Sequence, residues 1–170
     1  MFRSCSLVYI LLGRYDRVPA YIDLDPLSAY VRYRRMERAI LRNDKAAALE
    51  EARSISAGPH SYADARMIEA FLGGASPERV RQWSREAEGY LDRNNTPEFP
   101  FVEARYQAWA GQTEPALRLL KRAMANNYCS YPIMDSDPFL ANIRRLPEYK
   151  ELRQAGIACR ENFRAQMADR

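Results

Sequence analysis

The chain is poor in the residue types on which most enzyme active sites and metal centres depend. Its 170 residues include one histidine, His60, and three cysteines that form no Cys-x-x-Cys pair. The motifs Gly-x-Ser-x-Gly, Gly-x-x-x-x-Gly-Lys-Ser/Thr and His-Glu-x-x-His do not occur in it. His60 follows a proline just before a predicted helix start, which favours a loop position over a role as a general base. The sequence therefore predicts no catalytic residue, no metal site and no cofactor.

The few cysteines also argue against a disulfide framework. Cys5, Cys129 and Cys159 are an odd set, whereas disulfide-stapled secreted domains carry an even one, so a reducing compartment is favoured. Cys129 is interpreted as a packing residue. The apolar run 7–12, which follows Arg3, is too short to span a bilayer and has no clear cleavage site after it. We therefore expect a first buried helix, a cytoplasmic protein and no membrane partner.

Glycine is scarce as well, at seven residues, and only three of the 26 basic residues are lysines. The chain is 47% hydrophobic and 28% charged, which is typical of a soluble globular protein. The net charge of +4 is concentrated at the start, because residues 1–42 hold eight arginines and four acids. The preference for arginine is typical of a GC-rich genome, and the alternative is selection for two-point binding of carboxylates or phosphates.

What the sequence does contain is a series of well-marked helix starts. A capping side chain before a proline at the first helical position satisfies a free backbone N–H and fixes φ for the helix. This pattern occurs at Asp25-Pro26, Ser76-Pro77, Thr96-Pro97 and Asp137-Pro138, and Asn43-Asp44 opens a further segment. Asp23 and Asp135, which pair with Asp25 and Asp137 in sequence, are interpreted as part of these starts and not as catalytic carboxylates.

Short turns between segments with helical periodicity predict antiparallel helical hairpins. Val80, Trp83, Ala87 and Leu91, for example, are spaced as the apolar face of one helix. The predicted hairpins span residues 27–56, 62–92 and 98–126, with a degenerate hairpin over 1–24 and a C-terminal cap over 137–168. The prediction is an all-α protein with a single helical-repeat domain, residues 1–170, built as a right-handed stack of hairpins.

A repeated phrase supports the hairpins. Tyr62-Ala63-Asp64-Ala65-Arg66 is matched by Phe101-Val102-Glu103-Ala104-Arg105, and each copy leads to a glycine, Gly73 or Gly111. With Ala104, Ala116 and Ala123 at the expected points of close helix approach, the segment 98–126 resembles a tetratricopeptide repeat. The resemblance implies a solenoid of helix pairs whose first helices line a concave, partner-binding surface.

The C-terminal segment carries a second resemblance. Tyr128-Cys129-Ser130-Tyr131-Pro132, Asp137-Pro138-Phe139-Leu140 and Pro147-Glu148-Tyr149 are similar to the closing segment of tetratricopeptide regions in large bacterial signalling proteins, which carry kinase, cyclase or winged-helix domains. This implies a non-catalytic protein-interaction module, the sensor or adaptor tail of a signalling system. As a cap, Phe139 and Leu140 are expected to be buried against the predicted helix 114–126.

One arginine in each predicted first helix falls at a corresponding place, which we call the arginine ladder: Arg35, Arg66 and Arg105. Trp109 lies one helical turn after Arg105. The hypothesis is that these four residues line the concave surface and bind a protein or peptide of acidic character through two-point guanidinium contacts. The alternative is a chance match, because arginine is frequent throughout the chain.

The arginines of residues 32–42 offer a different surface. Arg32, Arg34, Arg35, Arg38 and Arg42 are interleaved with Tyr30 and Tyr33, and Arg32, Arg38 and Arg42 could form a patch for an anionic partner. Glu37 interrupts the series, the charge is modest and no nucleic-acid motif accompanies it. Nucleic acid is therefore disfavoured, and a DNA-associated regulator is the alternative function.

Overall fold

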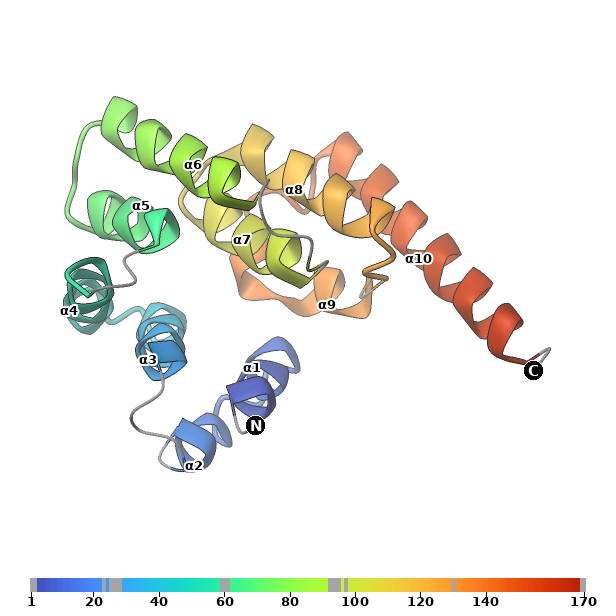
Figure 1. Cartoon of the computed structure of the whole chain (residues 1–170), viewed down its shortest axis with the longest axis horizontal. Coiled ribbons are helices and arrows are strands. Elements are labelled where there is room, and N and C mark those ends of the chain that lie inside the picture. The colour runs from blue at the N-terminus through green and yellow to red at the C-terminus, as the bar shows by residue number, and fades with distance from the viewer. Residues whose placement is uncertain are drawn as a thin grey trace. The chain divides into compact units, whose positions relative to one another are not determined.

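The computed structural model describes residues 3–22, 24, 29–58, 62–91, 96, 98–129 and 131–168. The ordered elements in these ranges are all helices, without a strand among them, which confirms the all-α class. The helices are α1 (Arg3–Leu11), α2 (Val18–Ile22), α3 (Ala29–Leu41), α4 (Lys45–Ser56), α5 (Ala63–Leu72), α6 (Pro77–Leu91), α7 (Glu98–Trp109), α8 (Thr113–Ala125), α9 (Tyr131–Ser136), the 3-10 turn η1 (Pro138–Leu140) and α10 (Pro147–Ala168) (Figure 1).

The chain forms two compact units, and the division falls inside α6. The first unit comprises residues 1–83 and the second residues 84–170. A single helix therefore contributes its first turns to one unit and its last turns to the other. The sequence predicted one domain over residues 1–170, and the continuous right-handed stack of tetratricopeptide type stays a prediction.

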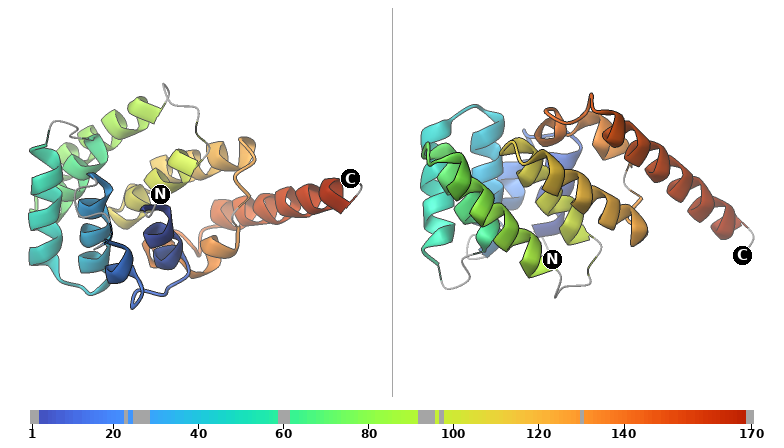
Figure 2. Two further views of the ribbon diagram at one scale, coloured as in Figure 1. Left: turned by 60° about the horizontal axis from the view of Figure 1, so that its bottom comes forward. Right: turned by 90° about the horizontal axis from the view of Figure 1, so that it is seen from above.

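In the first unit the helices pack in the order in which they follow one another. α1 contacts α2, both contact α3, α3 pairs with α4, and α4 pairs with α5. Figure 2 shows α3 and α4 side by side, as expected for the predicted hairpin over 27–56. Leu7 and Ile10 of α1 are buried, and Ile10 joins Val18 and Ile22 of α2 in one apolar cluster. Leu7 and Ile10 of the apolar run thus belong to a packed helix, as predicted, whereas Val8 and Leu12 are exposed.

In the second unit α7 and α8 form the central hairpin, and α10 lies against α8 and α9. Ala104, Ala116 and Ala123 are fully buried, in agreement with their predicted role at points of close helix approach. Gly111 closes the α7–α8 turn with a φ of 75°, a conformation that side chains rarely adopt. Gly156 allows α10 to come close, because a Cβ there would lie 3.0 Å from Tyr131 Cβ.

The C-terminal cap is buried as expected but contacts a different helix. Phe139 and Leu140 are almost fully enclosed. However, η1 packs against α7 and not mainly against α8, with the ring of Phe139 6.0 Å from that of Tyr106 and 6.1 Å from that of Trp109. The expectation of burial against helix 114–126 was therefore wrong about the partner. The reason is that Asp137, which caps η1, forms an ion pair with Arg105 of α7.

Three of the predicted helix starts are confirmed. Asp44 accepts a hydrogen bond from the Ala47 N–H (3.1 Å) at the start of α4, and Asp137 accepts one from the Phe139 N–H (3.0 Å) at η1. Ser76 accepts a longer bond from Arg79 N–H (3.4 Å) before α6. The predicted starts at Asp25-Pro26 and at Pro97 lie outside the described residues. Among the described helices, none combines the length and the apolar character that a membrane crossing requires.

Candidate functional site

A pocket of about 680 Å³ lies in the first unit between α4, α5 and the beginning of α6. Its volume is in the range of small-ligand sites. We call it the arginine–tryptophan pocket. It is lined by Arg53, Ser56, Ala57, Arg66, Glu69, Ala70, Gly73, Ala75, Arg79 and Trp83. All of these residues belong to one compact unit, so the pocket is a property of that unit alone.

Two guanidinium groups of the pocket stack on one indole. The Cζ atoms of Arg66, on α5, and Arg79, on α6, each lie 4.8 Å from the ring centroid of Trp83. The face of an indole attracts a cation, and a planar guanidinium that stacks there can still donate hydrogen bonds from its edges. Arg79 also donates one such bond, from Nη1 to Gln82 Oε1 (2.9 Å). The indole therefore positions both cations, and Gln82 positions Arg79 in addition.

The pocket has an excess of positive charge. The residues that line it include three arginines, Arg53, Arg66 and Arg79, and one acid, Glu69, whose Oε1 lies 3.9 Å from Arg53 Nε. That contact is long and largely exposed, so it neutralises little of the charge. The pocket therefore has a net formal charge of +2 and an aromatic surface beside it, a combination suited to an anionic group next to an apolar one.

The three members of the arginine ladder have different surroundings. Arg66 lines the pocket, and Arg35 is exposed on α3. Arg105, in contrast, is 0% exposed and forms a buried ion pair through Nε with Asp137 Oδ2, while its Cζ lies 4.8 Å from the ring centroid of Phe139. The prediction that Arg105 lies on an open partner-binding face was wrong, because η1 covers that side of α7.

Trp109 is likewise engaged within the second unit. It is half-buried, and its ring lies 6.1 Å from that of Phe139. The tryptophan that contacts Arg66 is instead Trp83, which its spacing in the sequence predicted to lie on an apolar helix face. The neighbours of Trp83 on that predicted face, Val80 and Ala87, are indeed buried. The signal that was missed is the spacing of Arg79 and Trp83, one helical turn apart, which places a cation over an indole.

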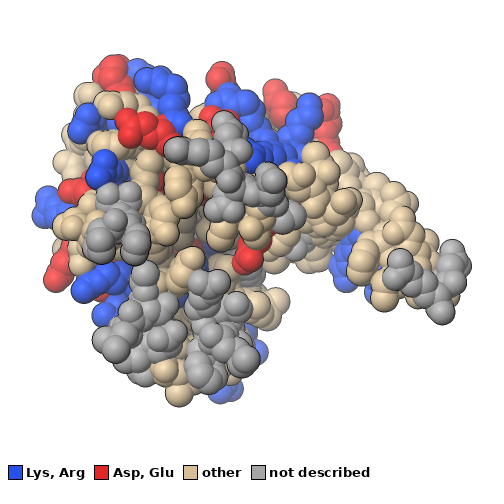
Figure 3. Space-filling view, in the orientation of Figure 1, with Lys and Arg blue, Asp and Glu red and all other residues tan. Residues whose placement is uncertain are grey.

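The arginine-rich segment of α3 offers fewer free cations than its sequence indicates. Arg34 is buried and paired with Glu37, and Arg32 forms an exposed ion pair with Glu51 of α4 (3.4 Å). Arg38 and Arg42 show no ion pair with any described residue. Figure 3 shows basic and acidic side chains interspersed over α4 and α5 on the visible face. These features weaken the prediction of an anionic-partner patch at Arg32, Arg38 and Arg42.

A half-buried carboxyl links α3 to the start of α5. The Tyr33 hydroxyl donates to Asp64 Oδ1 (2.9 Å), and the Ala65 N–H donates to the same oxygen (2.7 Å). Burial raises the pKa of Asp64 to about 6, although both hydrogen bonds act in the opposite direction. The acid of the repeated phrase therefore has a structural role here, close to Arg66 in sequence but outside the pocket lining.

This raised pKa predicts a pH-dependent stability. Because the folded state holds the proton of Asp64 more tightly than the unfolded chain, its contribution is greatest below about pH 4 and is lost as the pH rises to about 6. Asp64→Asn keeps an acceptor for Tyr33 and removes the titration. We expect its free energy of unfolding, relative to the wild type, to increase between pH 4 and pH 7 in urea titrations. A difference that does not change with pH would contradict the assignment.

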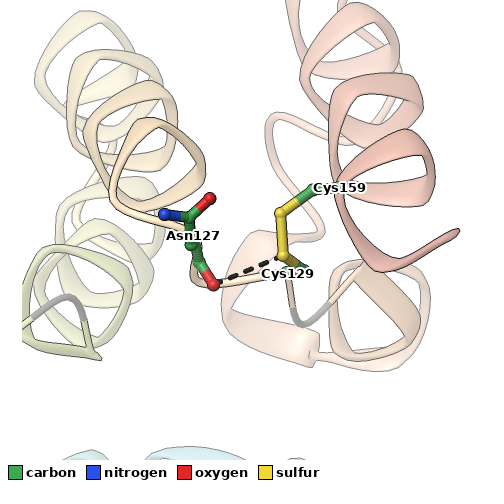
Figure 4. Close-up of a disulfide and its surroundings, with 3 residues drawn as sticks. All are labelled: Asn127, Cys129 and Cys159. Atoms are coloured by element: carbon green, nitrogen blue, oxygen red, sulfur yellow. Dashed lines mark hydrogen bonds between the residues drawn. A yellow bond between two sulfur atoms is a disulfide. The ribbon is translucent and has the colours of Figure 1, made fainter. Parts of the chain in front are cut away.

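The structure joins two of the three cysteines. Cys129, in the loop after α8, and Cys159, on α10, form a disulfide with their Cα atoms 5.5 Å apart (Figure 4). The Cys129 sulfur also lies 3.3 Å from the carbonyl oxygen of Asn127. The interpretation of Cys129 as a packing residue, in a chain without disulfides, was therefore wrong. The packing of α10 on α8 and α9 brings together two positions 30 residues apart.

The paired acids before η1 have structural partners. Arg153 binds both oxygens of Asp135 (2.5 and 2.7 Å), and Asp137 is bound by Arg105, in agreement with a structural interpretation of the two acids. Within the described part of the chain, no group of three or more histidine, cysteine or acidic side chains is placed to hold a metal ion. His60, Asp23 and Asp25 lie outside the described residues.

Comparisons of the chain with protein-family profiles, with curated proteins and with solved structures find no match. The class that can be stated is therefore an all-α protein with a cationic, tryptophan-containing pocket in its N-terminal unit. The features that bear on its function are those of the pocket itself.

Proposed function

We propose that the chain is a non-catalytic protein-interaction module that binds an acidic segment of a partner protein in the arginine–tryptophan pocket. The observation that carries the proposal is the stacking of Arg66 and Arg79 on Trp83 beside a third arginine, Arg53. The resemblance of the repeats to tetratricopeptide regions is consistent with a role as sensor or adaptor in a bacterial signalling system.

The chemistry of the pocket suits this ligand. A guanidinium fork binds a carboxylate at two points and loses little hydration in doing so. Trp83 also lines the pocket, so a neighbouring side chain of the bound segment can contact the part of the indole that the two guanidinium groups leave uncovered. Aromatic and arginine residues are the usual energetic centres of protein interfaces. Arg66, the member of the ladder that lines the pocket, keeps its predicted role in this proposal.

Peptide selection tests the proposal directly. Selection of a random peptide library on the wild-type protein is expected to enrich sequences with at least two Asp or Glu residues. Arg66→Glu should weaken the enriched peptides by roughly 1–3 kcal/mol or more, since it removes a charged hydrogen-bond donor and adds repulsion. Arg81→Glu, on the exposed side of α6 and outside the pocket lining, is the matched control. Enrichment without acidic residues, or equal binding by both variants, would refute the proposal.

The alternative is a DNA-associated function through Arg35, Arg38 and Arg42. Arg35 and Arg38 lie on α3, and Arg42 follows the last residue of that helix, Leu41. Their spacing of i, i+3 and i+7 is that of one helix face, and the Arg42 N–H still bonds to the Arg38 carbonyl oxygen (3.1 Å). Binding of this kind depends on counterion release, so affinity for any duplex should fall steeply with salt. Binding that persists at physiological salt and is lost in Arg38→Ala/Arg42→Ala would favour the alternative over the protein-interaction role.

A cytoplasmic location stays a prediction, and one feature weighs against it. Disulfides persist in oxidising compartments and are rare where thiols are kept reduced. The Cys129–Cys159 bond is therefore more typical of an exported protein or an exported domain. Intact-mass measurement with and without thiol alkylation, on protein taken from its native cells, would decide between the two compartments.

A further inference from the structure

We propose that the group bound by the arginine–tryptophan pocket is a phosphorylated side chain in an extended segment of the partner. This inference rests on the proposed function and goes beyond it, because it distinguishes a phosphoryl group from the carboxylates of an ordinary acidic sequence. Three features of the pocket carry it: its charge, the placement of its cations and its concave shape.

The charge of the pocket is matched better by a dianion than by one carboxylate. Arg53, Arg66 and Arg79 exceed Glu69 by two positive charges. A carboxylate would compensate only one of them. A phosphorylated serine or threonine carries about −1.5 to −2 charges at pH 7 on a single group, with three acceptor oxygens. It can therefore compensate the whole excess from one point in the pocket.

The placement of the cations also fits a phosphoryl group. The Cζ atoms of Arg66 and Arg79 each lie 4.8 Å from the centroid of the same indole, so the ring places both cations around one point of the pocket. Contact with the ring restricts both side chains before binding and so reduces the side-chain entropy that binding would otherwise cost. Arginine clusters are a general means of recognising phosphorylated segments, because each fork can bind two oxygens of the group.

A nucleic acid fits the same pocket less well. A duplex presents its phosphates along an extended line and needs a broad basic surface. Around the pocket, acids lie among the bases: Glu69 lines it, and Glu78 is paired with Arg81 on α6 (2.6 Å). The three arginines lie around one pocket and do not form an extended basic surface, which suits one projecting group of a protein segment.

The intrinsic fluorescence of Trp83 can report binding in the pocket. The chain has two tryptophans, so Trp109→Phe in the full-length protein leaves Trp83 as the single indole. Three peptide pools are titrated at physiological salt, with a central phosphoserine, glutamate or serine and mixed flanking residues. We expect the phosphoserine pool to change the Trp83 fluorescence and to bind at least about tenfold more tightly than the glutamate pool. Inorganic phosphate alone should bind far more weakly, because it lacks the flanking residues that contact the rest of the pocket lining.

Two matched variants test whether the fluorescence change comes from binding in the pocket. Arg79→Ala should weaken binding of the phosphoserine pool about tenfold, since one of three cations is lost. Arg81→Ala, which removes an arginine two residues away but outside the pocket, should change it less than about twofold. Circular dichroism melts of both variants serve as the folding control. Equal effects of the two changes would overturn the assignment of the pocket as the binding site.

The outcomes separate this inference from the function on which it rests. Equal binding of the glutamate and phosphoserine pools would overturn the phosphoryl inference and leave the acidic-segment function standing. Binding of neither pool would overturn both. Inorganic phosphate binding as tightly as the phosphoserine pool would overturn a protein partner in favour of a small anion. Displacement of the phosphoserine pool by a 20-base-pair duplex at physiological salt would overturn the assignment of a protein partner in favour of nucleic acid.

Discussion

Asp137→Asn is expected to destabilise the protein by about 3–5 kcal/mol, measured by urea unfolding at pH 7. The buried guanidinium of Arg105 then loses the charge that compensates it, and an uncompensated buried charge is costly. Asparagine keeps an oxygen for the Phe139 N–H, so the loss reports on the ion pair and not on the cap of η1. Few other single changes to a polar residue of this chain should have so large an effect.

The exposed pair of Arg153 and Asp135 is the matched control. It has the same residue types and two close contacts, but the two side chains are 33% and 43% exposed. Asp135→Asn should therefore cost less than about 1 kcal/mol. In addition, Arg105→Met combined with Asp137→Asn should recover part of the loss, because an apolar replacement removes the unpaired charge. Similar losses for Asp137→Asn and Asp135→Asn would show that burial does not decide the strength of these pairs.

The second large effect is expected from the disulfide. Reduction, or the change Cys159→Ser, should lower the free energy of unfolding by about 2–4 kcal/mol, because the bond closes a loop of about 30 residues and restricts the unfolded chain. The loss should be accompanied by looser attachment of α10, whose contacts are with α8 and α9. Hydrogen exchange of α10 with and without reductant measures this locally.

The variant supplies the control for the reductant. Dithiothreitol should lower the melting temperature of the wild type and leave that of Cys159→Ser unchanged, because the variant has no bond between these positions to reduce. If reductant shifts both proteins equally, or neither, the Cys129–Cys159 bond does not contribute to stability in solution.

The helix starts could be predicted from the sequence because capping is a local interaction. Asp44 and Asp137 each bind a backbone N–H within three residues, and Ser76 does so more weakly. The buried alanines of the α7–α8 hairpin were predictable for a related reason, since two helices joined by a short turn must pack on each other. In both cases the partner is close in sequence.

Which arginines are buried and which line a pocket could not be predicted from local sequence. Arg66 and Arg105 occupy the same place in the repeated phrase, yet one lines a pocket and the other is enclosed. The difference lies in η1, more than 30 residues after Arg105, which supplies Asp137 and Phe139 to that helix face. The disulfide escaped prediction for the same reason, because the separation of two cysteines in sequence does not reveal whether intervening helices bring them together.

The burial of polar groups along α7 limits how a binding signal could pass through the second unit. Besides Arg105, Gln107 of this helix binds Glu103 Oε1 (2.7 Å) and the Ser84 hydroxyl (2.7 Å) inside the protein. A slide of α7 by one turn, about 5.4 Å, would break the contacts to Asp137 and Ser84 together and leave several buried donors and acceptors unsatisfied. These buried contacts therefore oppose a piston-like movement of α7, whereas residues 161–168 of α10 are exposed and carry no such buried contacts.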